Sequence, residues 1–364
     1  MHRASLDTMN NNNNKLAYIG AIIDGEGCIL IGKHKSRGRY QYQSNISVIS
    51  KDKILTDFIN KLFPGSIGIK INKYYYWTLT NIKSIKNFLN AIIPYLLIKR
   101  EQAQLLLKYI NSREQNLREY DKSPYTPEEI ALYEQIKKLK KEYPTELPQY
   151  NFTDEEKLYY LAGLIDGEGS VRIAKAIHQN KYNNKRLHLV PQISIANTDK
   201  RMAEFLKNEF GGFYHTKKRQ SPKRTIYQWH MQGLKEDFFK SLDGKPILKQ
   251  EQLKLILDFI QLRKQKEHQR YNKEIDVFLK IRNLNKKGKE AYTYDELKQY
   301  SLFTSRNPRK FFIDKAKLED LYINKKLSIR QIAKLFNVAF DTVRLRLIKY
   351  NIPLRDFKEG IKLN

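Results

Sequence analysis

The 364-residue sequence predicts an α+β protein with two pseudo-symmetric αββαββα units, each built on a four-stranded antiparallel sheet, followed by a small all-α helix-turn-helix domain. An internal repeat indicates the two units, because residues 16–29 match residues 158–171 and three further blocks match in the same order. Polar and apolar side chains alternate after each first block, as half-buried strands require. Two short stretches with helical periodicity, outside the repeat, indicate the C-terminal domain.

Each unit begins with a helix, predicted over residues 15–25 in the first copy and 154–167 in the second. Two strands follow, and Asp52 or Asp199 then caps the next helix. Two more strands carry Trp77 and Trp229, which are the two tryptophans of the chain. Helices near 82–92 and 234–242 come next, and long helices from about 99 and 249 end the units.

The repeat also sets the expected domain boundaries. We expect a disordered tail at 1–14, the first unit at 15–120, a linker at 121–153, the second unit at 154–272, a connector at 273–310 and the helix-turn-helix domain at 311–364. The tail contains a run of asparagines, and the linker contains prolines around a charged segment that is itself predicted to be helical.

The charge balance indicates an anionic partner. The chain has 68 Lys and Arg residues against 39 Asp and Glu residues, a formal net charge of +29, and nucleic acid is the usual partner of such a surplus. A basic surface that binds nothing is the alternative. The single cysteine, Cys28, excludes a disulfide framework and a cysteine-based zinc site. No apolar run approaches the roughly 18 residues that a membrane span needs, so we expect no membrane partner.

Both first helices end in the same Gly-Glu-Gly sequence, at residues 25–27 and 167–169. Small residues inside these helices indicate that two helix backbones pack closely, namely Gly20, Ala21, Ala162 and Gly163. Such packing brings Glu26 and Glu168 to adjacent helix C-termini, where the helix dipole and mutual repulsion disfavour two carboxylates. Divalent cations would relieve both costs, and hard oxygen ligands suit Mg²⁺. Two solvated acids at glycine-rich helix ends are the alternative.

The paired segments, residues 19–27 and 161–169, resemble the signature of the LAGLIDADG homing endonucleases, and the resemblance covers roughly residues 15–270. It implies that the acids at the eighth position of the motif, Glu26 and Glu168, bind catalytic Mg²⁺ or another divalent cation such as Mn²⁺. It also implies that the backbone carbonyls of Gly25 and Gly167 add ligands. Many members carry Asp at this position, but Glu occurs too.

The resemblance assigns further roles outside the two acids. Asp24 and Asp166, at the sixth position of the motif, are interpreted as mainly structural. A lysine near the start of the last helix lies close to the cleavage site in the family, and the matching residues are Lys99 and Lys249. A polar residue at the end of the second strand positions water, and Ser50 and Asn197 occupy that place.

The same resemblance implies that the two sheets form a saddle in the major groove of DNA. In the strands, Ile46 and Val48 point to one face, and the row Ile67, Ile69 and Ile71 alternates with polar residues in the same way. Side chains suited to base edges occupy the other face. These predicted DNA-binding residues are Gln41, Gln43, Asn45, Ser47, Lys70, Asn72, Arg172, Gln192, Ser194, Lys217, Gln228 and His230. An ordinary solvated sheet face is the alternative.

The C-terminal domain has the pattern of a helix-turn-helix. Ser328 caps its first motif helix, Ala333 lets the helices cross closely, and Asn337 suits a left-handed turn. The second helix, near 339–349, presents Arg344 and Arg346 to a DNA groove. A small helical cap on the enzyme core is the alternative interpretation.

Together these features favour a monomeric, site-specific double-strand DNA endonuclease. The resemblance implies a long, asymmetric duplex target, hydrolysis of one phosphodiester per strand and 3′ overhangs, with the gene inside an intron. The alternatives are an RNA maturase that binds intron RNA and assists splicing, and a DNA-binding protein that has lost cleavage. Abundant Asn, Ile, Lys and Tyr fit an AT-rich genome, so we expect an organellar origin in a mitochondrion or chloroplast, with a bacterial or phage origin as the alternative.

Overall fold

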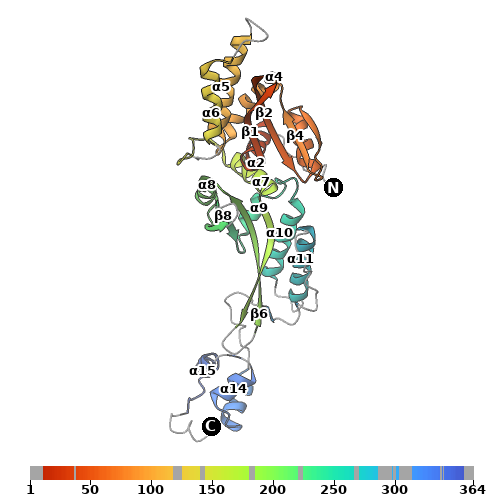
Figure 1. The fold of residues 1–364 in the computed structure, drawn as a ribbon. Helices are drawn as coiled ribbons and strands as arrows, with labels where there is room; N and C mark the ends of the chain where they lie inside the picture. Colours follow the sequence, from red (N-terminus) through yellow and green to blue (C-terminus); the bar gives the residue numbers. More distant parts are fainter. Residues whose placement is uncertain are drawn as a thin grey trace. The chain divides into compact units, whose positions relative to one another are not determined.

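The computed structural model describes residues 11–36, 38–117, 125–139, 144–179, 185–219, 224–265, 270–285, 297, 301–302, 314–336, 338 and 340–355. The chain forms two compact units, residues 1–302 and residues 303–364. The larger unit contains both copies of the repeat, and the smaller unit contains the helical C-terminal tail (Figure 1).

The first copy has the predicted order of elements. Its sheet is antiparallel, with the strand order β1-β2-β4-β3. Its elements are α2 (Asn12–Glu26), β1 (Gly27–Ser36), β2 (Arg39–Ser50), α3 (Lys53–Leu62), β3 (Ser66–Ile69), β4 (Tyr75–Leu79), α4 (Ile82–Ile92), the 3-10 turn η1 (Ile93–Tyr95) and α5 (Arg100–Leu117). Helix α2 begins at Asn12, because the Asn11 side chain accepts a hydrogen bond from Asn13 N, so three residues of the predicted tail are helical.

The second copy repeats this topology, with the strand order β5-β6-β8-β7 and a short parallel strand, β9 (Ser301–Leu302), beside β6. Its elements are α7 (Asp154–Gly167), β5 (Ser170–Gln179), β6 (Lys185–Asn197), α8 (Lys200–Phe210), β7 (Phe213–Arg219), β8 (Arg224–Gln232), α9 (Glu236–Ser241) and α10 (Gln250–Lys264). The predicted α+β architecture of two matched units is therefore confirmed.

The repeated unit is one helix longer than the sequence analysis expected. Helix α6 (Pro127–Leu139) lies in the predicted linker, and α11 (Arg270–Asn285) runs from the second unit into the predicted connector. Each of these helices packs on the long helix before it. A buried ion pair joins α5 to α6, between Arg113 and Glu129 at 3.4 Å, and another joins α10 to α11, between Arg263 and Glu274 at 2.7 Å. Residues 129–137 and 274–282 match in sequence, which supports their equivalence.

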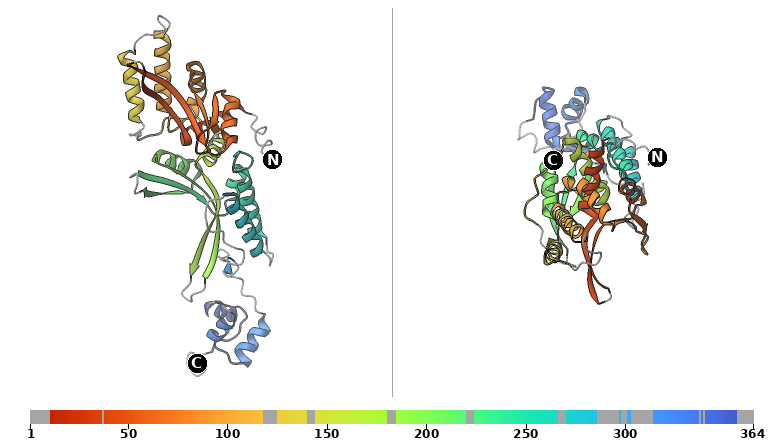
Figure 2. Two further views of the ribbon diagram at one scale, coloured as in Figure 1. Left: turned by 45° about the vertical axis from the view of Figure 1, so that its right-hand side comes forward. Right: turned by 90° about the horizontal axis from the view of Figure 1, so that it is seen from above.

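Each sheet has a buried face and an open face. Ile46, Val48 and Trp77 are fully buried on one face of the first sheet, and Trp229 is equally buried in the second. These residues pack on the helices, while the polar positions between them face the other way. Figure 2 shows the β5–β6 hairpin projecting beyond the helices of its unit.

The third strand of the first unit departs from the prediction. Ile67 and Ile69 are 46% and 63% exposed, because β3 lies at the edge of the sheet. The strand ends at Ile69, and Ile71 is fully exposed in the turn that follows. Lys70 and Asn72 therefore lie in this turn and not on the sheet face, as the hydrogen bond from Lys73 N to Lys70 O indicates.

The described residues of the C-terminal unit form three helical segments around their own core. They are α13 (Lys315–Glu319), which continues into a π-helical turn (Asp320–Asn324), α14 (Ile329–Leu335) and α15 (Phe340–Lys349). Ser328 caps α14 together with Gln331, and Ala333 is buried between the helices, as predicted. Asn337 lies outside the described residues. None of the helices in the described ranges is long and apolar enough to cross a bilayer.

Candidate active site at the helix seam

Helices α2 and α7 pack against each other at the centre of the larger unit (Figure 1). We call the interface between these two helices the seam. Their close approach depends on Gly163, because a Cβ atom there would lie 2.4 Å from Tyr18 O and 2.8 Å from the Cβ of Ala21. Gly20 packs against η1 instead, since a Cβ atom added there would lie 2.4 Å from Tyr95 O. The prediction that Gly20 lies in the seam is therefore wrong.

Two buried aspartates fix the ends of these helices. Asp24 accepts hydrogen bonds from Leu97 N at 2.6 Å and Lys99 N at 2.8 Å, and Asp166 accepts from Ile247 N at 2.5 Å and Lys249 N at 3.1 Å. Burial raises the pKa of both carboxyl groups, and these hydrogen bonds act against that shift. Both aspartates thus hold the segment that carries the lysine of their own unit.

Two tyrosines cross the seam to the same aspartates. Tyr18 donates to Asp166 at 2.7 Å, and Tyr160 donates to Asp24 at 2.7 Å. Burial raises the pKa of both phenols well above the usual value, so they remain hydrogen-bond donors. The reciprocal pairs set the register of one helix against the other.

The two lysines cap the C-terminal ends of the seam helices. Lys99 Nζ donates to the carbonyls of Ile23 at 2.8 Å, Asp24 at 2.9 Å and Gly27 at 2.7 Å. Lys249 Nζ donates to the matching carbonyls of the second copy, those of Ile165, Asp166 and Gly169. A cation is favourable at the negative end of a helix dipole. Burial lowers the pKa of Lys99, while Asp24 and Glu168 act to raise it.

The two motif glutamates lie across the seam from each other. Each glutamate lies against the glycine of the other helix. A Cβ atom built on Gly25 would lie 3.3 Å from the Cγ atom of Glu168, and a Cβ atom built on Gly167 would lie 3.5 Å from the Cγ atom of Glu26. Burial, and then repulsion from Glu26, raises the pKa of Glu168 to about 7, although Lys99 and Asn197 act to lower it. Burial also raises the pKa of Glu26, against the charges of Lys99 and Lys249.

The donor set fits a divalent cation that shares its ligands with a substrate. The described residues contain no cluster of three or more His, Cys, Asp or Glu side chains that could hold a metal ion. Two mutually repelling carboxylates at helix C-termini favour a bound cation. Hard cations such as Mg²⁺ commonly take one or two carboxylates and complete their shell with water and phosphate oxygens.

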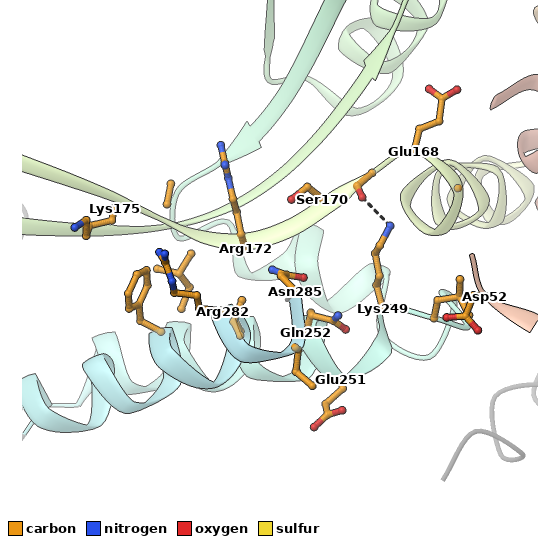
Figure 3. Close-up of a pocket in the computed structure, with 18 of the residues that line it drawn as sticks. Asp52, Glu168, Ser170, Arg172, Lys175, Lys249, Glu251, Gln252, Arg282 and Asn285 are labelled. Atoms are coloured by element: carbon orange, nitrogen blue, oxygen red, sulfur yellow. Dashed lines mark hydrogen bonds between the residues drawn. The ribbon is translucent and has the colours of Figure 1, made fainter. Parts of the chain in front are cut away.

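Two pockets meet at Glu168, and Glu26 lines the larger of them. The larger, of about 1160 Å³, is lined by Glu26, Glu168, Asp52 and Lys249, and it continues beneath β5. Figure 3 shows Glu168 at the end of α7, with Lys249, Arg172 and Arg282 along the same pocket. The smaller, of about 380 Å³, is lined by residues that include Glu168, Lys99, Asn197 and Asp199.

Comparisons with known proteins decide the family. The family model described as "LAGLIDADG endonuclease" matches residues 22–111 and 161–262, which together span both copies of the repeat. The chain belongs to the LAGLIDADG endonuclease family. The DNA endonuclease I-CreI of Chlamydomonas reinhardtii is 32% identical over 114 residues, covering 28% of this chain and 67% of that protein.

Solved structures of LAGLIDADG proteins share the fold. I-SmaMI bound to uncleaved DNA target in the presence of calcium ions has a TM-score of 0.56 at 17% identity, covering 75% of this chain and 99% of that chain. The LAGLIDADG homing endonuclease I-LtrWI bound to target DNA has a TM-score of 0.54 at 21% identity, covering 74% of this chain and 98% of that chain.

The site residues predicted from the two copies gather in one place. Glu26, Glu168, Lys99 and Lys249 all lie at the ends of the two seam helices, as do the backbone carbonyls of Gly25 and Gly167. Lys99 Nζ lies 3.5 Å from Gly25 O.

The two residues predicted to position water, Asn197 and Ser50, differ in their hydrogen-bond partners. Asn197 Nδ2 donates to both carboxylate oxygens of Glu168, at 3.1 and 3.4 Å. Ser50 Oγ accepts from Asp52 N at 3.0 Å, and no hydrogen bond within the described part of the chain joins it to Glu26.

The open sheet faces carry most of the predicted DNA-binding residues. In the first sheet, Gln41 and Gln43 are exposed, and Asn45 and Ser47 are half-buried on the same face. In the second sheet, the strand register places the predicted residues on one face, namely Arg172, Gln192, Ser194, Lys217, Gln228 and His230. Arg172 donates to Gln192 at 2.9 Å, and Lys217 donates to Gln228 at 2.7 Å.

Three of these residues are covered by their neighbours. Gln192, Ser194 and His230 are only 6%, 4% and 5% exposed. The His230 ring is stacked on His215 at 4.9 Å and on Phe213 at 5.4 Å between ring centroids. Neither stacking partner was among the predicted DNA-binding residues, although both share the alternation of Lys217 along β7. Burial and the neighbouring His215 lower the pKa of His230 to about 4, so its ring is neutral at pH 7.

Proposed function

We propose that the chain is a site-specific double-strand DNA endonuclease that hydrolyses one phosphodiester bond on each strand with a bound divalent cation. The observation that carries this proposal is the pair of Glu26 and Glu168, one from each copy, each reaching over the glycine at the end of the other helix. Two equivalent acids in one chain suit the two strands of one duplex. Because both acids come from one chain, a monomer suffices.

Each residue of the site has a role in this chemistry. When bound, the cation would supply Lewis-acid charge to a phosphate oxygen and lower the pKa of water. Glu26 and Glu168 would hold it, with Mg²⁺ as the physiological ion and Mn²⁺ as a substitute. Lys99 and Lys249 would place positive charge where the phosphate gains negative charge in the transition state. Asn197 would orient the carboxylate of Glu168.

The open sheet faces supply the proposed DNA-binding surface. The net charge of +29 favours a polyanion, and exposed Gln41, Gln43, Arg172 and Lys217 are suited to base edges or phosphates. The two sheets carry different side chains, so the target would be long and asymmetric. By likeness to the family, the products would carry 3′ overhangs.

The C-terminal unit would make a second DNA contact. Its helix α15 exposes Arg344 and partly exposes Arg346, and it follows α14 as a recognition helix follows the first helix of a helix-turn-helix. We place the gene in an intron of an AT-rich, organellar genome, because the composition fits such a genome and the family usually occupies introns.

Plasmid cleavage tests the proposal. The substrate is a supercoiled plasmid that carries the intronless allele of the host gene, incubated with protein and Mg²⁺ or with EDTA. We expect linear product only with the metal, and loss of cutting by at least about a hundredfold in Glu26→Gln and Glu168→Gln, with binding retained. A wild type that binds but never cuts would favour an inactive DNA-binding protein. Rescue of intron splicing without cutting would favour an RNA maturase.

A further inference from the structure

The two halves of the active site are built from equivalent positions but hold different side chains. Asn197 and Ser50 both end the second strand of their unit, and both accept a hydrogen bond from the backbone two residues later. Asn197 Oδ1 accepts from Asp199 N at 2.8 Å, which fixes the amide so that Nδ2 faces Glu168. Serine has no second polar atom to offer Glu26.

The two glutamates differ in burial and in the hydrogen bonds that they accept. Glu168 is half-buried and held through both carboxylate oxygens by Asn197. Glu26 is more exposed than Glu168, and among the described residues no group donates a hydrogen bond to it. A side chain that is already held in place loses less conformational freedom when it engages a ligand.

A second, independent difference lies in the loop that follows each strand. Asp199 is buried and paired with Arg201 at 2.6 Å, and Arg201 also donates to the carbonyl of Ile98 at 3.3 Å. This contact ties the loop of the second copy to the residue before Lys99. In the first copy Asp52 is exposed, and Ile54 stands at the position of Arg201, so the equivalent loop has no such ion pair.

We propose that the two half-sites are unequal, and that the strand engaged by Glu168, Asn197 and Lys99 is hydrolysed before the strand engaged by Glu26 and Lys249. Asn197 is a positioning residue that acts through Glu168, and Arg201 is a positioning residue that acts through the loop carrying Asn197. The order of cutting is thus built into the fold. This inference rests on the proposed endonuclease function.

The test resolves the two strands. A duplex containing the cleavable site is labelled with a different fluorophore on each 5′ end and cut under single-turnover conditions with Mg²⁺. We expect the two strands of the wild-type reaction to differ in rate by about tenfold or more, the order expected from one hydrogen bond to a charged group. On a supercoiled plasmid, a nicked form should accumulate before the linear form.

Reciprocal variants assign the effect to these positions. Asn197→Ser should slow only the faster strand, and Ser50→Asn should speed only the slower strand. The double exchange should bring the two rates together or reverse their order. A general loss of folding would slow both strands equally and leave their ratio unchanged, and thermal unfolding by circular dichroism monitors it. Arg201→Ile, which copies residue 54, should slow the same strand as Asn197→Ser, and Arg201→Lys should restore part of the rate.

Equal strand rates in the wild type, or a strand ratio that the double exchange leaves unchanged, would overturn the inference while leaving the endonuclease function intact. A wild type that cuts neither strand would instead overturn the proposed function, and this inference with it.

Discussion

The carboxyl group of Glu168 makes the stability of the protein depend on pH. Its pKa is raised from 4.5 to about 7, chiefly by burial and then by Glu26. Between these values the folded carboxyl group keeps a proton that the unfolded chain has released, so the contribution of Glu168 to stability is fully present below about pH 4.5 and is lost as the pH rises through 7. A bound cation favours the charged form and acts in the opposite direction.

This linkage gives a pH prediction. In EDTA, the free energy of unfolding should fall between pH 5 and pH 7.5 by more in the wild type than in Glu168→Gln, with a difference of no more than about 3 kcal/mol. Urea unfolding at the two pH values, with and without Mg²⁺, measures it. Identical pH profiles for the two proteins in EDTA would contradict a raised pKa for Glu168.

Gly163 allows a second prediction at the scale of one residue. Gly163→Ala places a Cβ atom 2.4 Å from the carbonyl oxygen of Tyr18, so the seam must open. We expect a loss of about 1–3 kcal/mol in unfolding free energy, despite alanine's better helix propensity. Gly32→Ala is the matched control, because its Cβ would meet nothing closer than 3.7 Å. Equal effects of the two substitutions would rule out the tight seam.

Among the elements, α6 and α11 bear the clearest stability prediction. The Arg263–Glu274 pair that joins α10 to α11 is 4% and 0% exposed, so removing one partner leaves a buried charge. Arg263→Met should cost about 3–5 kcal/mol, measured by denaturant unfolding. The exposed Lys137–Glu134 pair provides the control, and Lys137→Met should cost under about 1 kcal/mol. The double variant Arg263→Met/Glu274→Leu should regain much of the loss.

Sequence patterns predicted the elements whose signals repeat at a fixed spacing. The seam helices, the glutamate pair, the lysines and both tryptophan strands follow from matched blocks. The charged segment of the linker was predicted to be helical, and α6 lies there. That α6 and α11 are equivalent parts of the repeat escaped, because charged surfaces and nearby prolines are typical of a linker, although residues 129–137 and 274–282 do match. The exposure of edge strand β3 escaped because alternation does not indicate whether a strand has helices above it.

Differences between paired residues escaped for another reason. Ser50 and Asn197 align in sequence, but only distances show that the longer side chain reaches its glutamate. The burial of His230 likewise depends on which aromatic rings lie on the neighbouring strand. The contacts of Gly20 depend on a turn more than 70 residues away in the chain, at Tyr95.

At the scale of the whole molecule, the C-terminal unit is compact and has its own hydrophobic core. Deleting residues 303–364 should shorten the DNA footprint and weaken binding, while cleavage by the seam site persists at higher protein concentration. Footprinting and gel-shift titrations of the two proteins on the same duplex measure this. An unchanged footprint and affinity would refute a DNA contact by the tail.

The proposed function requires two acids, one from each copy, that jointly hold divalent cations against DNA. The most direct measurement is anomalous diffraction from crystals of the protein bound to its duplex with Mn²⁺. We predict metal peaks within about 2–2.5 Å of carboxylate oxygens from both Glu26 and Glu168 and of a phosphate oxygen. Peaks that contact one glutamate or neither, with the other side chain turned away from the DNA, would contradict the account.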